Sequence, residues 1–382
     1  MPMNSKWDVP RLGQVALVER SAVKPENIIS GTTYIGMEHI DNDGEFKKTP
    51  SVESGELASN KFSFDERHVL YGKLRPYLKK IARPSFHGIC STDILPILPK
   101  DSLNKDYLYY FLRQPHMIEF AVSRCSGANL PRLSPKELTE FPIPLPPLEE
   151  QKRIAAILDK ADAIRKKRKQ AIELTEQFLR SAFLDMFGDP ITNPKGWTTY
   201  KMGDVIEFKG GSQPPKSSFS TEDKTGYVRL IQIRDFKSDK YPTYIPKKKA
   251  TRPFAKDDVM IARYGPPVFQ ILRGLEGTYN VALMKASPRG EGITKDFIFH
   301  LLQTPKIHDY VVANSERTAG QSGVNLDLLN HYLLPLPPLE IQETIIQTIK
   351  IAEQKKSKQV LFHTVAIDLC AALAAKAFRG EL

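Results

Sequence analysis

A short basic stretch, Tyr71–Lys80, holds the residue types best suited to chemistry with a polyanion. Its cations are interleaved with aromatic rings, and together they are Tyr71, Lys73, Arg75, Tyr77, Lys79 and Lys80. Lysine and arginine bind phosphate oxygens, and an arginine can also pair with the edge of a guanine. The stretch therefore predicts contacts with nucleic acid, although any one of these residues also suits an ordinary solvated surface.

Further polar and basic candidates lie at expected turns and strand ends. They are Asn129 in the loop 126–129, then Gly211, Ser212, Gln213, Gln232, Arg234, Lys247, Lys248, Lys249, Arg263, Tyr264, Gln321 and Ser322. The formal net charge of +11 makes a polyanionic partner plausible without proving one. The first 150 residues are balanced in charge, so contacts there must come from local clusters.

Catalytic signatures are largely missing from the sequence. It contains no phosphate-binding G-x-x-x-x-G-K-[ST], no G-x-G-x-x-G, no G-x-S-x-G and no H-E-x-x-H. The eight histidines are scattered, and the three cysteines lie far apart without the spacing of metal ligands. We therefore expect a chain without catalytic residues, bound metal or cofactor of its own.

The composition and the first residues of the sequence bear on the cellular location of the protein. No run approaches about 18 consecutive apolar residues, which argues against a membrane span. The first residues carry Lys6, Asp8 and Arg11 and lack the apolar core of a secretion signal. With three separated cysteines, this composition favours the reducing cytoplasm.

The chain repeats itself at an offset of about 190 residues. Its two tryptophans, Trp7 and Trp197, are separated by that distance. The strongest match joins Leu145–Gln151 to Leu336–Gln342, with six of seven residues identical. The other matching pairs are Leu12–Val15 with Met202–Val205, Val69–Leu70 with Val259–Met260, and Lys105–Tyr109 with Lys295–Phe299. Such a repeat predicts two copies of one folded unit.

Each copy reads as an α+β unit followed by one long helix. Apolar runs predict strands at Thr33–Ile40, Val228–Ile233 and Val259–Ala262, and helices are expected at 105–112 and 295–302. Residues 148–187 and 339–378 contain neither proline nor glycine and carry apolar residues at spacings of three and four. We expect these helices to pack antiparallel on each other, the alternative being that each folds back on its own unit.

The predicted fold is therefore α+β, with two homologous domains separated by two long antiparallel helices and related by a pseudo-twofold repeat. The expected domains are residues 1–147 and 189–338, and the expected helical regions are residues 148–188 and 339–382.

These features together resemble the specificity (S) subunit of type I restriction–modification systems. The resemblance is carried by the Trp-x4-Leu-Gly-x-Val opening, the repeated Pro-Leu-Pro-Pro-Leu-x-x-Gln junction, the charged helix Gln151–Phe187 and the ending Ala377–Leu382. It covers the whole length, including the order unit, helix, unit, helix.

The resemblance implies a non-catalytic, sequence-specific DNA-binding subunit. Each globular unit would be a target recognition domain that reads one half of a bipartite, asymmetric DNA sequence. The helices would set the spacing between the halves and dock two modification (M) subunits, which carry the S-adenosylmethionine chemistry of adenine methylation. Restriction (R) subunits would add ATP- and Mg-dependent translocation and cleavage.

The helix starts are the expected docking residues for the M subunits. They are Leu148, Glu149, Gln151 and Ile154 in the first copy, and Leu339, Glu340, Gln342 and Ile345 in the second. Their acidic residues also suit the N-terminal end of a helix dipole. The basic runs 165–169 and 355–358 lie mid-helix, where they could face DNA phosphates or simply solvent.

Two alternatives remain open from the residues alone. One is a self-sufficient methyltransferase or nuclease with unrecognised motifs, which predicts cofactor binding or cleavage by the purified chain. The other is a coiled-coil scaffold or interaction protein, which predicts no salt-sensitive affinity for DNA.

Overall fold

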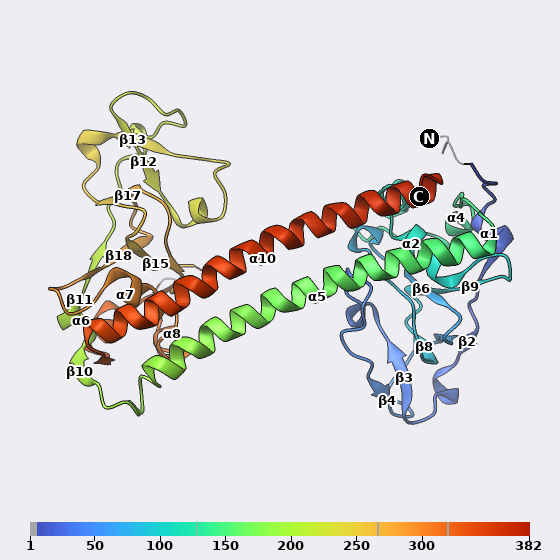
Figure 1. Ribbon diagram of the computed structural model, residues 1–382, viewed down its shortest axis with the longest axis horizontal. Helices are drawn as coiled ribbons and strands as arrows, with labels where there is room; N and C mark the ends of the chain where they lie inside the picture. The colour runs from blue at the N-terminus through green and yellow to red at the C-terminus, as the bar shows by residue number, and fades with distance from the viewer. Residues whose placement is uncertain (1–5, 128, 266, 319–320) are drawn as a thin grey trace. The chain divides into compact units, whose positions relative to one another are not determined.

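The computed structural model describes residues 6–127, 129–265, 267–318 and 321–382 (Figure 1). The chain divides into two compact units, and each unit contains one globular part and half of each long helix. Unit 1 comprises Met1–Gln170 with Val360–Leu382, and unit 2 comprises Ala171–Gln359. The long helices begin where expected, at Leu148 and Leu339, but their halves pack into both units.

The globular part of unit 1 holds a four-stranded antiparallel sheet, β1-β9-β6-β7, and a five-stranded sheet, β2-β5-β8-β3-β4, in which β3 and β8 run parallel. The strands are β1 Ala16–Val18, β2 Ala22–Val23, β3 Thr32–Ile35, β4 Ser51–Val52, β5 Lys61–Phe64, β6 Val69–Gly72, β7 Ile81–Ala82, β8 Gly88–Cys90 and β9 Ile94–Pro99. The helices are α1 Leu12–Val15, α2 Lys105–Leu112, α3 Pro115–Ser123 and α4 Pro135–Thr139, with 3-10 turns η1 Pro25–Asn27, η2 Met37–His39 and η3 Pro76–Leu78.

The globular part of unit 2 repeats this plan with the sheets β11-β18-β15-β16 and β13-β12-β17-β14, in which β12 and β17 run parallel. Two-stranded pairs β10-β21 and β19-β20 complete it. The strands are β10 Thr198–Lys201, β11 Ile206–Gly210, β12 Tyr227–Ile231, β13 Tyr244–Pro246, β14 Pro253–Phe254, β15 Val259–Ala262, β16 Ile271–Leu272, β17 Gly277–Tyr279, β18 Leu283–Pro288, β19 Glu316–Thr318, β20 Gln321–Gly323 and β21 Leu333–Leu336. The helices are α6 Met202–Val205, α7 Lys295–Leu301, α8 Pro305–Ala313 and α9 Leu326–His331, with 3-10 turns η4 Lys216–Ser218, η5 Ile233–Phe236 and η6 Lys247–Lys249.

The matching strand orders confirm the internal repeat and the α+β class. The sheet β1-β9-β6-β7 has the same order along the chain as β11-β18-β15-β16, and each unit has one parallel pair in its second sheet. The strand expected at 259–262 and the helix expected at 105–112 have those bounds in the structure.

Two expected strands are shorter than their apolar runs. The run Thr33–Ile40 is a strand only to Ile35, and the run Val228–Ile233 only to Ile231. Each strand is followed by a 3-10 turn whose first amide is capped by a side chain three residues later. Gly36 N donates to His39 Nδ1 at 3.0 Å, and Gln232 N donates to Asp235 Oδ2 at 2.7 Å. The competing side-chain acceptor ends the strand before the end of the apolar or alternating run.

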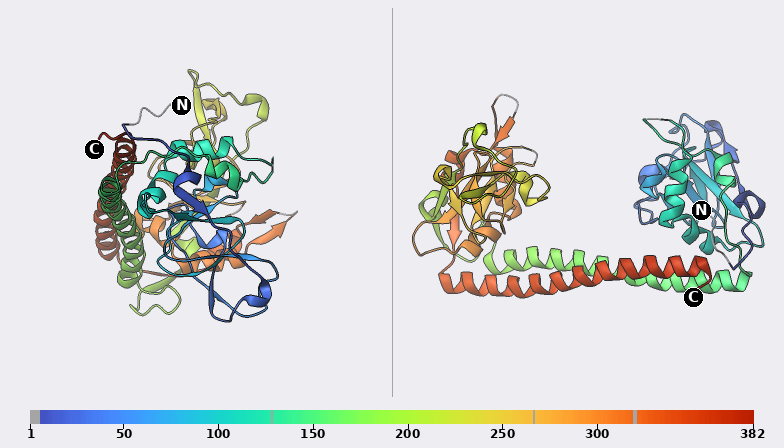
Figure 2. Two further views of the ribbon diagram at one scale, coloured as in Figure 1. Left: turned by 90° about the vertical axis from the view of Figure 1, so that its right-hand side faces the viewer. Right: turned by 90° about the horizontal axis from the view of Figure 1, so that it is seen from above.

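The long helices α5 (Leu148–Phe187) and α10 (Leu339–Arg379) lie side by side and antiparallel within each unit (Figure 2). In unit 1, Cys370 Sγ lies 3.5 Å from the carbonyl oxygen of Ala161. In unit 2, Thr175 Oγ1 donates to Gln359 Oε1 at 3.0 Å. The expected antiparallel packing of the two helices is therefore confirmed, and each helix also packs on the globular parts.

Aromatic side chains anchor the helix pair in each hydrophobic core. In unit 1, Phe378 of α10 packs against Tyr107 and Phe111 of α2, with ring centroids 5.0 and 5.5 Å apart. In unit 2, Phe183 and Phe187 of α5 pack against Phe297 of α7 at 5.7 and 5.5 Å. These contacts bury one side of the helix pair and leave the other side exposed.

The glutamine of the repeated junction joins each long helix to its globular part. Gln151 is fully buried, and its Oε1 accepts from Asn104 N at 2.8 Å. Its Nε2 donates to the carbonyls of Ser102 and Pro146 at 2.9 and 2.8 Å. The amide thus satisfies three backbone groups that have no partner in regular secondary structure.

Gln342 repeats this arrangement in unit 2. Its Oε1 accepts from Thr294 N at 3.1 Å, and its Nε2 donates to Gly292 O and Pro337 O at 2.8 and 2.9 Å. The junction motif is therefore explained by a structural amide bridge in both copies.

An acidic loop, residues 41–45, ties the globular part of unit 1 to α5. Arg165 Nη1 lies 2.9 Å from Asp43 Oδ1, Lys169 Nζ lies 3.1 Å from Asp43 Oδ2, and Lys166 pairs with Glu45. Arg165 and Lys166 also pair with Asp162 of α5, each at 2.8 Å. Three cations of the basic run 165–169 are therefore engaged in ion pairs within unit 1, and Lys169 also remains exposed to solvent.

One helix among the described residues, Leu339–Arg379, is long and apolar enough to cross a membrane by length and composition. An 18-residue window within it has a mean hydropathy of 1.6 and is 11% buried. A single helix of this kind is weak evidence for a membrane span. The sequence predicts no membrane span because it contains no uninterrupted apolar run of sufficient length.

We predict that Gln151→Ala lowers the free energy of unfolding of unit 1 by about 2–3 kcal/mol, because it leaves buried backbone groups without partners. Urea unfolding followed by hydrogen exchange at residues 102–104 measures this loss. Glu149→Ala, an exposed change two residues away on α5, is the control and should change stability by less than about 0.5 kcal/mol. Equal stability of Gln151→Ala and the control would contradict the bridging role.

We predict that Asp43→Asn loosens the acidic loop and costs about 1 kcal/mol, the value expected for a partly solvated ion pair. Burial would raise the pKa of Asp43, but Lys169 and Arg165 lower it further, so the net shift is downward. A lowered pKa means that the stabilisation is present at neutral pH and is lost as pH falls through the folded-state pKa. Hydrogen exchange of residues 41–46 at pH 7 and in acid tests this prediction. Asp101→Asn is the exposed control. If hydrogen exchange of this loop in the parent protein did not increase in acid, the prediction would be wrong.

Candidate nucleic-acid interface

The predicted stretch Tyr71–Lys80 forms a turn held in a strained backbone conformation. Arg75 and Lys79 have φ angles of 51° and 54°, in the left-handed region that disfavours side-chain-bearing residues. Between them, Leu78 N donates to Arg75 O and Lys79 N donates to Pro76 O, both at 2.9 Å. The turn therefore has one defined shape.

Neighbouring segments hold this turn from two sides. Arg75 N donates to Pro131 O at 2.8 Å, and Leu133 N donates to Lys73 O at 3.0 Å. On the other side, Arg113 Nη1 lies 3.3 Å from the carbonyl oxygen of Lys79. The loop 126–132, which includes the candidate Asn129, is thus joined to the basic turn, and the two predicted segments form one surface.

The side chains that this surface exposes are partly different from those expected. Arg75 and Lys79 are exposed, as are Tyr77 and Leu78, whose exposed fractions are 49% and 38%. Asn129 is also exposed. An arginine, a lysine and an aromatic ring on a rigid turn are suited to phosphate and base contacts.

Tyr71 and Lys80 are placed elsewhere and need correction as contact candidates. Tyr71 is buried in the core, which raises the pKa of its hydroxyl. Lys80 donates to the carbonyl of Met37, and burial lowers the pKa of its ammonium group. Strand alternation cannot show this, because Tyr71 lies on a strand whose residues are all buried.

Lys73 and Arg132 share one carboxylate at the base of the turn. Lys73 Nζ lies 3.9 Å from Asp93 Oδ1, and Arg132 Nε lies 3.4 Å from the same oxygen. Arg132 is exposed and was not identified from the sequence. The sequence feature that could have identified Arg132 is its position shortly after the candidate loop 126–129.

Unit 2 repeats the same turn with other residues. Gly265 and Phe269, each 190 positions after Arg75 and Lys79, have φ angles of 90° and 61°. Tyr264 forms a β-bridge with Gly323, just as Leu74 does with Arg132 in unit 1. The two turns therefore share one backbone arrangement and differ in the side chains they present.

The turn of unit 2 carries two of the predicted residues. The guanidinium of Arg263 lies 5.2 Å from the centre of the Tyr264 ring, and Tyr264 is 37% exposed. Gln321 and Ser322 lie on the adjoining strand β20, but their side chains are outside what the structure describes, as are Pro266 and Gly320.

The remaining candidates of unit 2 fall into two groups. Gly211 and Ser212 are half-buried, and their amides donate to Leu283 O and Tyr279 O at 2.9 and 3.2 Å. At Gly211 a Cβ would lie 1.9 Å from the carbonyl oxygen of Asn280, so no side chain fits. The exposed candidates are Gln213, Arg234, Lys247 and Lys248, while Gln232 and Lys249 are half-buried.

A second basic and aromatic surface of unit 2 forms beside η5 and β13. Arg234 Nη2 lies 3.4 Å from Tyr241 O and from Thr243 Oγ1, and Gln232 Nε2 lies 3.3 Å from the same hydroxyl. Tyr241 is 62% exposed with the Lys240 ammonium 5.2 Å from its ring centre. Lys240 and Tyr241 were missed by the sequence analysis, although a tyrosine beside a lysine in a loop is the kind of signal used at Tyr77.

Among the residues that the structure describes, no group of three histidine, cysteine, aspartate or glutamate side chains is arranged to hold a metal ion.

The chain is similar to specificity subunits of type I restriction enzymes. It is 29% identical over 188 residues to the type I restriction enzyme EcoDI specificity subunit of Escherichia coli, covering 47% of this chain and 42% of that protein. It is 31% identical over 153 residues to the type I restriction enzyme MjaIX specificity subunit of Methanocaldococcus jannaschii, covering 36% and 35%. The chain thus aligns with less than half the length of these two relatives. It aligns with 67% of the E. coli EcoBI specificity subunit at 23% identity, over 74% of its own length.

Solved structures show the same fold at low identity. One chain, from work on complex assembly and conformational transition of the type I R-M system, matches with a TM-score of 0.65 and 23% identity over 98% of both chains. The type I restriction–modification system S subunit from M. genitalium matches with a TM-score of 0.58 and 13% identity, over 98% of this chain and 96% of that one.

The family model for the type I restriction modification DNA specificity domain matches residues 4–174 and again residues 194–361. The two matches follow the internal repeat and together cover most of the chain. This protein therefore belongs to the type I restriction modification DNA specificity domain family.

Proposed function

We propose that this chain is the DNA-specificity subunit of a type I restriction–modification complex, with each globular part reading one half of a bipartite, asymmetric target. The observation that carries the proposal is the repeated turn at 73–80 and 263–270, which has the same left-handed positions in both units but different side chains. One framework with two sets of exposed side chains suits the recognition of two different half-sites.

The proposed role is recognition without catalysis. The exposed residues of the two turns include cationic and aromatic side chains, which bind and position nucleic acid. We infer that S-adenosylmethionine, ATP and Mg belong to modification and restriction subunits of the same complex. The proposed location is the cytoplasm, where such a complex would meet DNA.

Four of the eight residues expected to dock modification subunits are buried and cannot form that surface. Gln151, Ile154, Gln342 and Ile345 are fully buried within their own units, where the glutamines form the amide bridges. Leu148, Glu149, Leu339 and Glu340 are exposed and remain candidates.

Exposed apolar side chains on the long helices support a larger docking surface. In unit 1, Leu361, Phe362, Val365 and Leu369 of α10 are between 55% and 63% exposed. In unit 2, Leu174 and Phe178 of α5 are 55% and 57% exposed, and they line a groove of about 440 Å³ with Ile351 of α10. A contiguous apolar stripe on a helix is typical of a protein interface, and the same residues account for the high hydropathy of α10.

The decisive experiment is co-expression with a modification subunit, followed by sequencing of the DNA for methyladenine. We expect one bipartite motif whose two halves differ. The double change Leu361→Ser with Phe362→Ser should prevent co-purification of the modification subunit, whereas Lys160→Ala, an exposed change on α5, should not.

The outcomes separate the alternatives. A complex that forms but methylates no fixed motif would contradict the recognition role. Absence of salt-sensitive DNA binding, together with absence of a complex, would favour the scaffold alternative, because phosphate contacts make affinity fall steeply with salt.

We predict that Arg75→Gly relaxes recognition at one half-site only, by about ten- to a hundredfold, the loss expected for one arginine–base contact. Glycine adopts a φ of 51° without strain, so the variant should keep its stability to within about 1 kcal/mol. Methylation motifs of the variant measure this. An unchanged methylation motif in Arg75→Gly would show that Arg75 is not part of the interface. At the equivalent position of unit 2, Gly265→Ala should lower stability, because alanine is strained at the Gly265 φ angle of 90°.

A further inference from the structure

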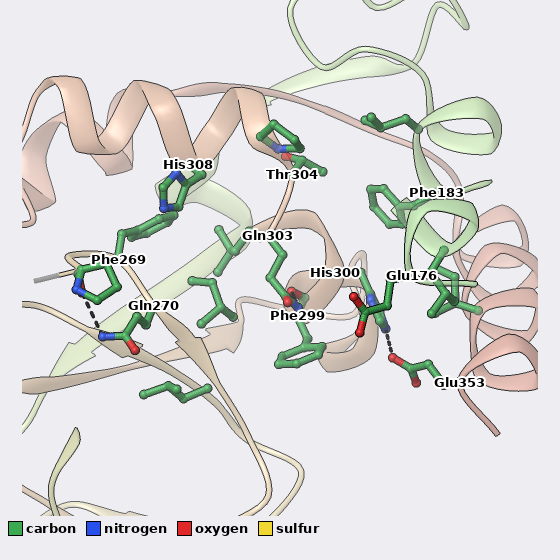
Figure 3. Close-up of a pocket in the computed structure, with 18 of the residues that line it drawn as sticks. Glu176, Phe183, Phe269, Gln270, Phe299, His300, Gln303, Thr304, His308 and Glu353 are labelled. Carbon is green, nitrogen blue, oxygen red and sulfur yellow. Dashed lines mark hydrogen bonds and ion pairs between the residues drawn. The ribbon is translucent and has the colours of Figure 1, made fainter. Parts of the chain in front are cut away.

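Unit 2 contains a pocket of about 560 Å³ between the helix pair and the globular part (Figure 3). Side chains of α5 and α10 form one wall, and the segment after β15 and the helices α7 and α8 form the other. The lining residues that matter below are Phe183, Phe269, Phe299, His300, Gln303, Glu353 and Lys356. Its walls combine aromatic rings with carboxylate and amide groups.

The corresponding place in unit 1 is filled by the chain itself. The acidic loop 41–45 lies there: Tyr109 Oη donates to Asp43 O at 3.3 Å, and Arg113 Nη2 donates to Asn42 O at 3.2 Å. Tyr109 and Arg113 are the repeat equivalents of Phe299 and Gln303. The fold therefore accommodates a turn of polypeptide at this position.

Unit 2 has no such loop in the pocket. Its equivalent segment also follows a 3-10 turn, η5, but there Asp239 pairs with Arg229 at 2.6 Å. None of the residues 237–241 lines the pocket. The site that unit 1 closes from within is open in unit 2.

The loop site of unit 1 and the pocket of unit 2 differ in the number of cations that the long helix supplies. In unit 1, three cations of α5, Arg165, Lys166 and Lys169, meet an acidic loop. Their repeat equivalents on α10 are Lys356, Ser357 and Val360, so two positive charges are lost. Lys356 in turn pairs with Glu176 of α5 at 2.8 Å.

Glu353 is the carboxylate left facing the pocket. Its repeat equivalent, Asp162, pairs with Arg165 and Lys166. Among the described residues, the group within 4.0 Å of the Glu353 carboxylate is His300 Nε2. Nearby cations are engaged elsewhere, since Arg273 and Lys350 pair with Asp296 at 2.5 and 2.7 Å.

His300 does not supply the missing positive charge. Burial lowers the pKa of its imidazole to about 4, so the ring is neutral at physiological pH. Burial also raises the pKa of Glu353, against the effects of Lys356 and Arg273. The pocket thus holds an incompletely compensated carboxylate beside aromatic walls.

We propose that this pocket of unit 2 binds a segment of the modification subunit that places a lysine or arginine side chain beside Glu353. Phe299, which lines the pocket and is half-buried, would contact the stem of that side chain. The proposal rests on the proposed function for the identity of the partner.

The apolar groove on the same helix segments supports the modification subunit as the occupant. Glu353 and Lys356 lie on the turns of α10 that also carry Ile351 and Lys355 of the groove. Neighbouring positions on a helix point to different faces, so the groove and the pocket lie on different faces of α10. A partner bound along the groove would reach the mouth of the pocket with a segment that passes around α10.

The test places a photo-reactive side chain at the exposed position Gln303 in the co-expressed complex. We expect it to cross-link to a modification-subunit peptide that contains lysine or arginine, identified by mass spectrometry. A second probe at Gln270 on the opposite wall guards against local misfolding at Gln303. Glu353→Gln should weaken binding of the modification subunit about tenfold, the loss of one charge-assisted hydrogen bond, whereas the exposed change Glu291→Gln should not.

The results distinguish this proposal from the proposed function. If the complex forms and methylates a bipartite motif, but both probes fail to cross-link to the modification subunit, only the pocket proposal fails. Cross-links to a second copy of this chain, or equal binding by Glu353→Gln and the parent, would also overturn it. If no complex forms at all, both proposals fail together.

Discussion

The structure depends on one buried amide in each copy. Gln151 and Gln342 sit in the first turn of the two long helices, and each bonds three backbone groups of the preceding proline-rich run and of the loop before a core helix. A buried backbone group without a partner is costly, so the direction of the helix relative to its globular part is fixed at its first turn. The apolar contacts of Phe378 and Phe183 then extend along helices that are already oriented.

This constraint explains why the junction motif repeats while the exposed surfaces do not. The prolines prevent the helix from extending backwards, and the glutamine satisfies the carbonyls that the prolines leave open. The recognition turns face no such requirement on their side chains. Arg75 and Gly265 occupy the same left-handed position, and they differ because the backbone there is held by Pro131 and Gly323 rather than by the residue itself.

The sequence predicts the framework better than the surface. Proline, glycine and periodicity act locally, so the repeat, both long helices, the helix 105–112 and the strand 259–262 could be identified without coordinates. The left-handed backbone at Arg75 and Lys79 could not, because no glycine marks these two positive φ angles. Tyr71 was misplaced because its burial depends on how its sheet packs, and Lys80 because its ammonium donates to Met37, a residue distant in the sequence. Arg132 was missed because it meets the basic turn only through the fold.

The basic run 165–169 shows a second limit of sequence analysis. Its charge suggests DNA or solvent, but its partners, Asp43 and Glu45, lie more than a hundred positions earlier in the chain. Charge pairing between residues so far apart in the sequence is visible only in the folded structure. A comparison of the two copies then shows how this pairing differs between them. Unit 1 then shows a loop and a helix that complement each other, whereas unit 2 shows a pocket with fewer cations and an exposed carboxylate at Glu353. The two copies share one framework, so the loop of unit 1 and the open pocket of unit 2 are alternative ways of covering the same position. In unit 1 the chain covers it with its own loop, and in unit 2 the position is available to another protein.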